Sequence, residues 1–162
     1  MNSKRFIVGS TFLAVLLILL FYKISAIQVS YSDHHFYLKD KTFEIGWIHS
    51  VEKEPWFEKY ELRNDDLYLV ETRFKTFGAG TPSTGEIIPS NDGFVHMRMN
   101  RKMEAIHLVV SENIKTTLYT EQSNIPLYKL TEKYGAITIE SKKLPLWRLL
   151  EVMTSDRFKE AE

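Results

Sequence analysis

Apolar and polar side chains alternate through most of this chain from residue 27 onward, and this alternation constrains the fold more than any other feature. In residues 42–49 it places four residues on one face of an extended segment: Phe43, Ile45, Trp47 and His49. In residues 56–63 it does the same for Trp56, Glu58, Tyr60 and Leu62. A period of two is typical of strands with one buried face. The pattern therefore predicts a domain built from β-strands.

Further segments with strand character follow at short intervals. They are residues 67–77, 94–100, 103–110, 115–120, 125–130 and 136–140, with turns expected at 64–66 and 100–102. Pro126 indicates an edge strand, because proline cannot donate to a sheet. No strand–helix alternation supports a parallel sheet. The sequence therefore predicts an all-β fold, an antiparallel sandwich or barrel-like domain. Residues 144–153 are expected to form a short helix, with a last strand as the alternative.

The N-terminal segment differs from the rest of the chain. Residues 6–22 contain 17 residues without a charge, preceded by Lys4 and Arg5 and followed by Lys23. This length lies at the short end of a transmembrane helix. An uncleaved signal anchor over residues 1–26 is expected, with a signal peptide cleaved after Ile24-Ser25-Ala26 as the alternative. Lys4 and Arg5 are expected to stay in the cytoplasm, so the rest of the chain is expected to face outward.

The predicted organisation follows from that segment. A signal anchor (1–26) crosses the cell membrane once and precedes an extracytoplasmic β domain (27–153) and a charged tail (154–162). If the signal is cleaved, the domain is secreted. The chain has no cysteine, which excludes disulfides, thiolate zinc sites and a cysteine nucleophile. Residues 27–162 carry 18 basic and 21 acidic residues, so general nucleic-acid binding is not expected.

The segment His49–Glu58 combines a histidine, a serine and three carboxylates. Ser50 and His49 suggest a nucleophile and its base, but neighbouring residues of a strand point to opposite faces. No G-x-S-x-G motif is present. The alternatives are a strand end with an ordinary turn, and a ligand or partner site at that rim. The five histidines lack the spacing of metal ligands, so no metal and no cofactor is expected.

A glycine-rich connection of 16 residues, 78–93, lies between two predicted strands. Loops of this length are often functional. Gly78-Ala79-Gly80 does not match the dinucleotide fingerprint, so nucleotide binding is not expected. The loop is either a tight strand exit or a place where backbone N–H groups, assisted by Arg73, hold a small anion.

Together these segments resemble a known family. The pattern Phe43…His49-Ser50-Val51-Glu52-Lys53-x-Pro55…Glu58-x-Tyr60, followed by Glu71-x-Arg73-Phe74…Phe77-Gly78-Ala79-Gly80-x-Pro82, resembles the bacterial domain-of-unknown-function family 1850. The resemblance implies a small exported or membrane-anchored protein encoded beside tripartite ATP-independent periplasmic (TRAP) transporters of the TAXI type. It implies no catalytic residues.

These observations lead to one expected function and two alternatives. The expected function is a non-enzymatic accessory protein that contacts a TRAP-type permease or its solute-binding protein. The alternatives are a stand-alone small-solute binding module and an extracytoplasmic hydrolase-like enzyme. The expected contact residues are His49, Ser50, Glu52, Pro55, Glu58, Arg73, Gly78, Ala79, Gly80 and Pro82.

Overall fold

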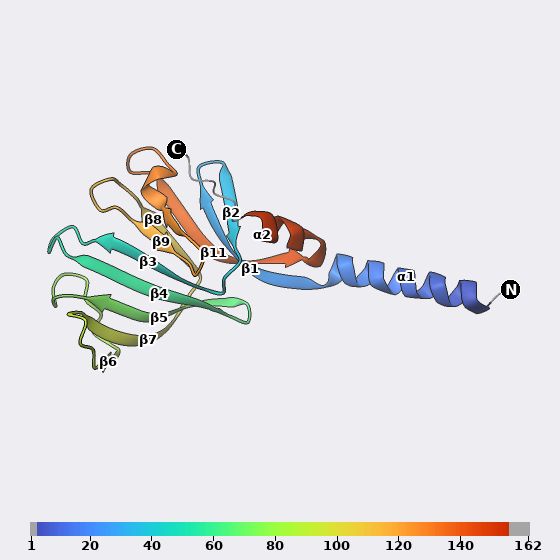
Figure 1. Ribbon diagram of the computed structural model, residues 1–162, viewed down its shortest axis with the longest axis horizontal. Helices are drawn as coiled ribbons and strands as arrows, with labels where there is room; N and C mark the ends of the chain where they lie inside the picture. The colour runs from blue at the N-terminus through green and yellow to red at the C-terminus, as the bar shows by residue number, and fades with distance from the viewer. Residues whose placement is uncertain (1–2, 156–162) are drawn as a thin grey trace.

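The computed structural model describes residues 3–155 and shows a mostly β domain with a helix projecting from it (Figure 1). The helix, α1 (Ser3–Phe21), leads directly into the first strand. All strands belong to two antiparallel sheets. The all-β prediction is therefore confirmed.

The larger sheet has seven strands and carries both segments singled out in the sequence. Its order is β10 (Asn124–Pro126), β9 (Thr117–Tyr119), β3 (Thr42–Ile48), β4 (Pro55–Arg63), β5 (Asp66–Phe74), β7 (Val95–Met103) and β6 (Glu86–Ile88). The predicted turn after β4 is confirmed, with Asn64 in the left-handed conformation at φ 57°. Pro126 lies on an edge strand, as expected.

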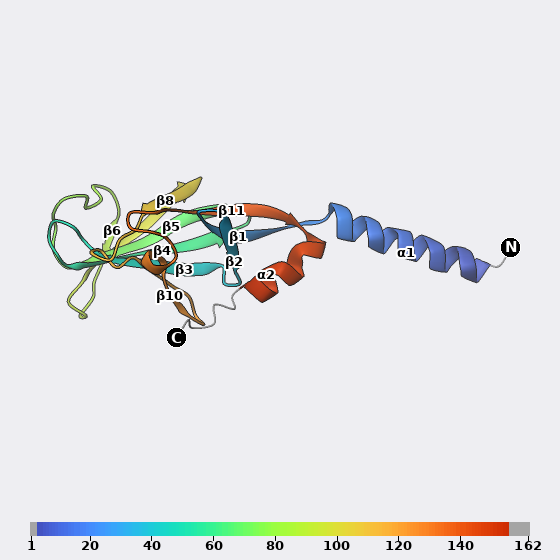
Figure 2. The ribbon, with the colours of Figure 1, turned by 90° about the horizontal axis from the view of Figure 1, so that it is seen from above.

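The smaller sheet has four strands and draws on both ends of the domain. Its order is β2 (His34–Leu38), β1 (Lys23–Tyr31), β11 (Ala136–Pro145) and β8 (Ala105–Val109). Only Glu104 separates β7 from β8, so the chain passes from one sheet to the other at this residue. The two sheets lie at an angle to each other (Figures 1 and 2).

One hydrophobic core joins the two sheets. The smaller sheet contributes Ile27, Val29, Phe36, Leu38, Ile106, Ile137 and Ile139, and the larger one contributes Phe43, Ile45, Tyr60, Leu62, Leu67, Leu69, Leu118 and Ile125. Each sheet keeps two end strands, β2 and β8 in one and β10 and β6 in the other. The arrangement is therefore an open pair of sheets.

Two local predictions are wrong. Residues 100–102, expected to be a turn, lie inside β7, because β7 continues along β5 and pairs Arg101 with Leu69. The strand expected over 125–130 ends at Pro126, and a 3₁₀ helix, η1 (Leu127–Lys129), follows. The long connection also contains a strand, β6, which pairs with β7.

The C-terminal segment forms the expected helix. After η2 (Leu146–Arg148), α2 (Leu149–Ser155) packs its buried Val152 against Ala26, Tyr37 and Leu144. The small helix therefore covers the outer side of the smaller sheet near β1. The predicted charged tail, 154–162, lies outside the described residues from 156 onward.

The N-terminal helix is confirmed, but the predicted transmembrane span is not. Lys4 and Arg5 lie within α1, so its uncharged part extends only from Phe6 to Phe21, about 24 Å at 1.5 Å per residue. Over residues 3–155 no helix combines the length and the apolar content that a bilayer crossing requires. β1 begins at Lys23, so the candidate cleavage segment, residues 24–26, lies within a paired strand.

Candidate functional site

The two motif segments meet at one end of the larger sheet. β3 ends, β4 begins and β5 ends at this edge, because the three strands are antiparallel neighbours. The turn between β3 and β4 and the chain leaving β5 therefore lie side by side (Figure 1). We call residues 49–55 together with 75–82 the rim.

The side chain of Glu52 joins the two segments of the rim. Its Oε1 accepts a hydrogen bond from the backbone N–H of Ala79 at 2.9 Å. Its other carboxylate oxygen, Oε2, forms an ion pair with Nδ1 of His49. A second link runs in parallel, since Oγ1 of Thr76 donates to Oε2 of Glu54 at 2.7 Å. The segments form one connected unit through carboxylates that are adjacent only in the folded chain.

Gly78 is required by this arrangement. A Cβ atom at this position would collide with Oε1 of Glu52. Any side chain larger than hydrogen would push the Glu52 carboxylate away from Ala79. The two segments that carry the resemblance thus contain a carboxylate and a glycine that are in close contact in the folded chain.

The Ala79 N–H also changes the acidity of Glu52. This hydrogen bond, and to a lesser degree the charge of His49, holds the pKa of Glu52 below its ordinary value of 4.5. The stabilisation from the bridge is complete above that value. It is lost as the pH falls through the lowered pKa of the folded state, because protonation removes the charge.

We expect the rim to open in acid. Below about pH 4.5 the protection of the Ala79 amide against hydrogen exchange should fall, while amides in the middle of β4 keep theirs. In Glu52→Gln the side-chain oxygen still accepts from Ala79 but does not titrate, so the protection should become independent of pH. An Ala79 amide in the natural protein that shows no more acid sensitivity than in Glu52→Gln would contradict this role of Glu52.

An aromatic stack supports the rim from below. The His49 ring lies 5.3 Å from that of Trp56, which lies 5.9 Å from Trp47 and 4.8 Å from Phe74. Nε1 of Trp56 donates to Oγ1 of the buried Thr72 at 2.9 Å. Trp47 and His49, which alternation placed on one face of their strand, both lie against this stack. The stack fixes the direction in which His49 presents its ring to Glu52.

A hollow of about 290 Å³ lies between the rim and the core-facing side of the sheet. Four predicted residues line it together: His49, Ser50, Glu58 and Gly80. Gly80 has φ +80°, a conformation that favours glycine, and its Cα faces open space. The remaining walls come from Trp47, Trp56 and Ile114.

The other predicted residues have separate roles. Ala79 contributes its backbone N–H, Pro55 begins β4, and Pro82 is half-buried in the loop beyond the rim's glycines. Arg73 is not part of the site. Its Nη2 donates to Oε1 of Glu44 at 2.6 Å and its guanidinium lies 4.4 Å from the Phe57 ring centre.

Arg73 faces away because of strand alternation. Its neighbours Thr72 and Phe74 are buried on the core-facing side of β5, so Arg73 points to the outer side. The expectation that Arg73 assists the Gly78–Gly80 segment is therefore wrong. The alternation along β5 already predicts the outward direction of Arg73, because its two neighbours in the strand are core-facing.

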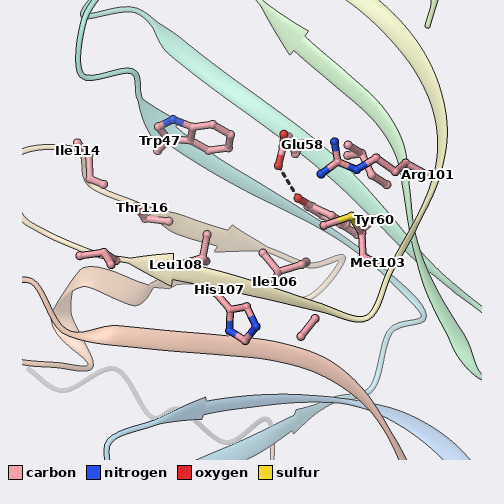
Figure 3. A pocket seen from close by; sticks show the side chains of 13 residues that line it. Trp47, Glu58, Tyr60, Arg101, Met103, Ile106, His107, Leu108, Ile114 and Thr116 are labelled. Atoms are coloured by element: carbon pink, nitrogen blue, oxygen red, sulfur yellow. Dashed lines mark hydrogen bonds between the residues drawn. The ribbon is translucent and has the colours of Figure 1, made fainter. Parts of the chain in front are cut away.

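A second cavity continues from the hollow along the core-facing side of the larger sheet. This cleft has a volume of about 330 Å³ and shares Trp47, Glu58 and Ile114 with the hollow. Arg101, Tyr60 and Met103 line it from the larger sheet, and Ile106 and Leu108 line it from β8 (Figure 3). Sequence reasoning missed Arg101, because residues 100–102 have the composition of a turn.

Glu58 lies where the hollow and the cleft meet. Its Oε2 accepts a hydrogen bond from the hydroxyl of Tyr60 (Figure 3). Burial raises the pKa of Glu58, although the Tyr60 hydrogen bond and the charge of Arg101 act in the opposite direction. Burial and the neighbouring Glu58 raise the pKa of Tyr60 as well, which keeps its hydroxyl protonated.

The arrangement offers binding groups more readily than a catalytic centre. Within residues 3–155 no three His, Cys, Asp or Glu side chains are placed to hold a metal ion. Ser50 and His49 line the same hollow, but the described part of the chain contains no hydrogen bond between them. A serine nucleophile requires that contact.

The fold and the rim together define a class: a small two-sheet β domain with an N-terminal helix and a cross-linked rim at its far end. Comparison with protein families matches residues 43–127 to DUF1850, a domain of unknown function. The chain belongs to this family, as the motifs at the rim indicated. The comparisons found no match among the curated proteins and none among the solved structures.

Proposed function

We propose that this chain is a non-enzymatic accessory protein, attached to the outer face of the cell membrane by α1, that uses the rim to bind the solute-binding protein of a TRAP-type transporter. The observation that carries the proposal is the rim itself, two hydrogen-bonded segments that present apolar side chains to solvent. The transporter association comes from the family resemblance.

The attachment is supported by the surface of α1. Its apolar side chains from Ile7 to Phe21 are 38–74 % exposed where they are described. Such a surface is unfavourable in water and requires an apolar surrounding.

The apolar tips of the rim support a protein partner. Val51 and Phe77 are 66 % and 60 % exposed, and they belong to the two segments that Glu52 joins. Exposed apolar residues on a rigid support are typical of contact surfaces, because little entropy is lost when they are covered.

The position of the rim favours a soluble partner over the permease. The β4–β5 turn lies beside the start of β1, where Oγ of Ser25 donates to Oδ1 of Asp65 at 2.5 Å. The rim lies at the other end of β4, nine residues or about 30 Å away. It therefore projects away from α1 (Figure 1). A partner that reaches it lies outside the membrane.

Co-purification from the native host in mild detergent tests the proposal. The tagged full-length chain should retain a TRAP-type solute-binding protein, and the double variant Val51→Ser, Phe77→Ser should retain at least about tenfold less. Tyr134→Ser, equally exposed at 59 % but outside the rim, is the matched control and should behave like the natural chain. Equal retention by the rim variant would refute the assignment of the contact.

A hydrolase-like enzyme is a weaker second candidate. The ion pair between His49 and Glu52 favours it, because it resembles a base held by a carboxylate. The missing contact with Ser50 counts against it. Ester hydrolysis by the purified chain that disappears in both His49→Ala and Ser50→Ala would favour the enzyme.

A further inference from the structure

The cleft beside β8 exists because the chain changes sheets at Glu104. β7 ends in the larger sheet, and β8 continues at the edge of the smaller one. The sheets therefore separate at this point, and Ile106 and Leu108 face Trp47 and Tyr60 across a gap (Figure 3). Cavities of about 300 Å³ and above accommodate small organic molecules.

Glu58 and Arg101, two groups of opposite charge, line this cleft without forming an ion pair. Arg101 lies on the core-facing side of β7, where its cross-strand partner is Leu69. Among residues 3–155 the Arg101 side chain has no hydrogen bond and no ion pair, although its charge acts on Glu58. Glu58 lies two strands away on β4, so the two backbones are about 10 Å apart. The Tyr60 hydroxyl occupies Oε2 of Glu58 and leaves Oε1 open to the cleft.

A carboxyl group in a partly apolar cleft is unfavourable unless hydrogen bonds compensate its burial, and this applies to Glu58. Arg101 stays exposed, so its guanidinium is accessible to a ligand. A guanidinium that faces an apolar wall is suited to a carboxylate, which it binds through two parallel hydrogen bonds. An open carboxylate oxygen accepts from a hydroxyl or an ammonium group. The walls formed by Trp47, Met103 and Leu108 suit an apolar remainder.

We propose that the cleft binds a small organic carboxylate that also carries a hydroxyl or amino group. The carboxylate of the ligand binds the Arg101 guanidinium. Its hydroxyl or amino group donates a hydrogen bond to Oε1 of Glu58, and its apolar part packs against Trp47 and the β8 side chains. The His107 ring takes no part, because its Nδ1 lies 3.2 Å from Oγ1 of Thr138 on β11. This site is separate from the apolar tips of the rim, so either proposal can fail alone.

A matched series of probes tests the ligand chemistry. The full-length chain in a non-ionic detergent is titrated calorimetrically with phenyllactate, phenylalanine, 3-phenylpropionate and 2-phenylethylamine. The series is repeated with the corresponding isobutyl compounds. Phenyllactate or phenylalanine, or its isobutyl counterpart, should bind about tenfold or more tightly than the compounds lacking either polar group. The preference between the first two shows whether the donor is a hydroxyl or an ammonium.

Substitutions identify the residues. Arg101→Gln should weaken binding of the best probe by about ten- to a hundredfold. Arg101→Lys should weaken it less, because the positive charge remains although the two parallel N–H donors of the guanidinium are lost. Glu58→Gln should reduce the ratio of affinities between the best probe and 3-phenylpropionate, which lacks the donor group. Arg98→Gln is the matched control, since Arg98 lies on the same strand but pairs with Glu86 at 2.8 Å on the outer side. Because all variants are measured in the same detergent, partition of the probes into micelles cancels.

Three results would overturn the proposal. The first is that no probe binds saturably at millimolar concentration. The second is that Arg101→Gln and Arg98→Gln bind the best probe equally well. The third is that 2-phenylethylamine and phenylalanine bind with equal affinity. Thermal unfolding of each variant verifies that it is folded. Arg101 is exposed, so its replacement should leave the unfolding temperature unchanged.

Discussion

Replacing Trp56 by alanine should lower the free energy of unfolding by about 3–5 kcal/mol, which is the usual cost of removing a buried aromatic side chain. Trp56 is 5 % exposed and contacts Trp47, His49 and Phe74 through its ring. Removing it leaves a cavity below the rim. It also leaves the buried hydroxyl of Thr72 without the indole N–H. Urea denaturation followed by circular dichroism measures the change.

Two controls separate the causes. Trp56→Phe retains an aromatic ring and loses the indole N–H bond, so its cost should be about 1–2 kcal/mol. Trp147→Ala removes a tryptophan that is 58 % exposed and should change stability by no more than about 0.5 kcal/mol. If Trp56→Ala and Trp147→Ala had the same small effect, the stack would not be a structural support. The alanine variant should also lose protection at the Ala79 amide, because His49 is no longer oriented.

The second large effect is expected at the start of β1. A chain that begins at Ile27 should be about 2–4 kcal/mol less stable in its β domain than a chain that begins at Lys23. Residues 23–26 pair with residues 142–145 of β11, and Ala26 is 5 % exposed against Tyr37, Leu144 and Val152. Removing the four residues exposes this cluster and leaves residues 142–145 without a strand partner, because β8 pairs only with residues 136–140 of β11.

The comparison isolates the strand from the helix. Both shortened chains lack α1, so the difference between their urea midpoints reports residues 23–26 alone. Equal midpoints would show that this end of β1 adds nothing. The result also bears on signal cleavage, because a chain processed after Ala26 would begin with the weakened sheet.

Much of the fold could be predicted because it depends on local periodicity. Alternation placed Trp47 and His49 on one face of their strand, and the structure stacks both rings on Trp56 of the neighbouring strand. Asn64 marked a hairpin turn, and Pro126 marked an edge strand. The same rule applied to β5 would have placed Arg73 on the outer side. Residues 100–102 were misjudged, because turn composition is overridden where a neighbouring strand offers backbone partners.

The sequence by itself determined most strands, their buried faces and the family, because alternation and short motif segments are properties of neighbouring residues. Only the tertiary structure decided that Glu52 reaches Ala79, 27 residues away, and that Gly78 must therefore lack a side chain. The tertiary structure also places Arg101 and Glu58 in one cleft. The physical reason is that strand order and the change of sheet at Glu104 depend on contacts between distant residues, which no local pattern encodes.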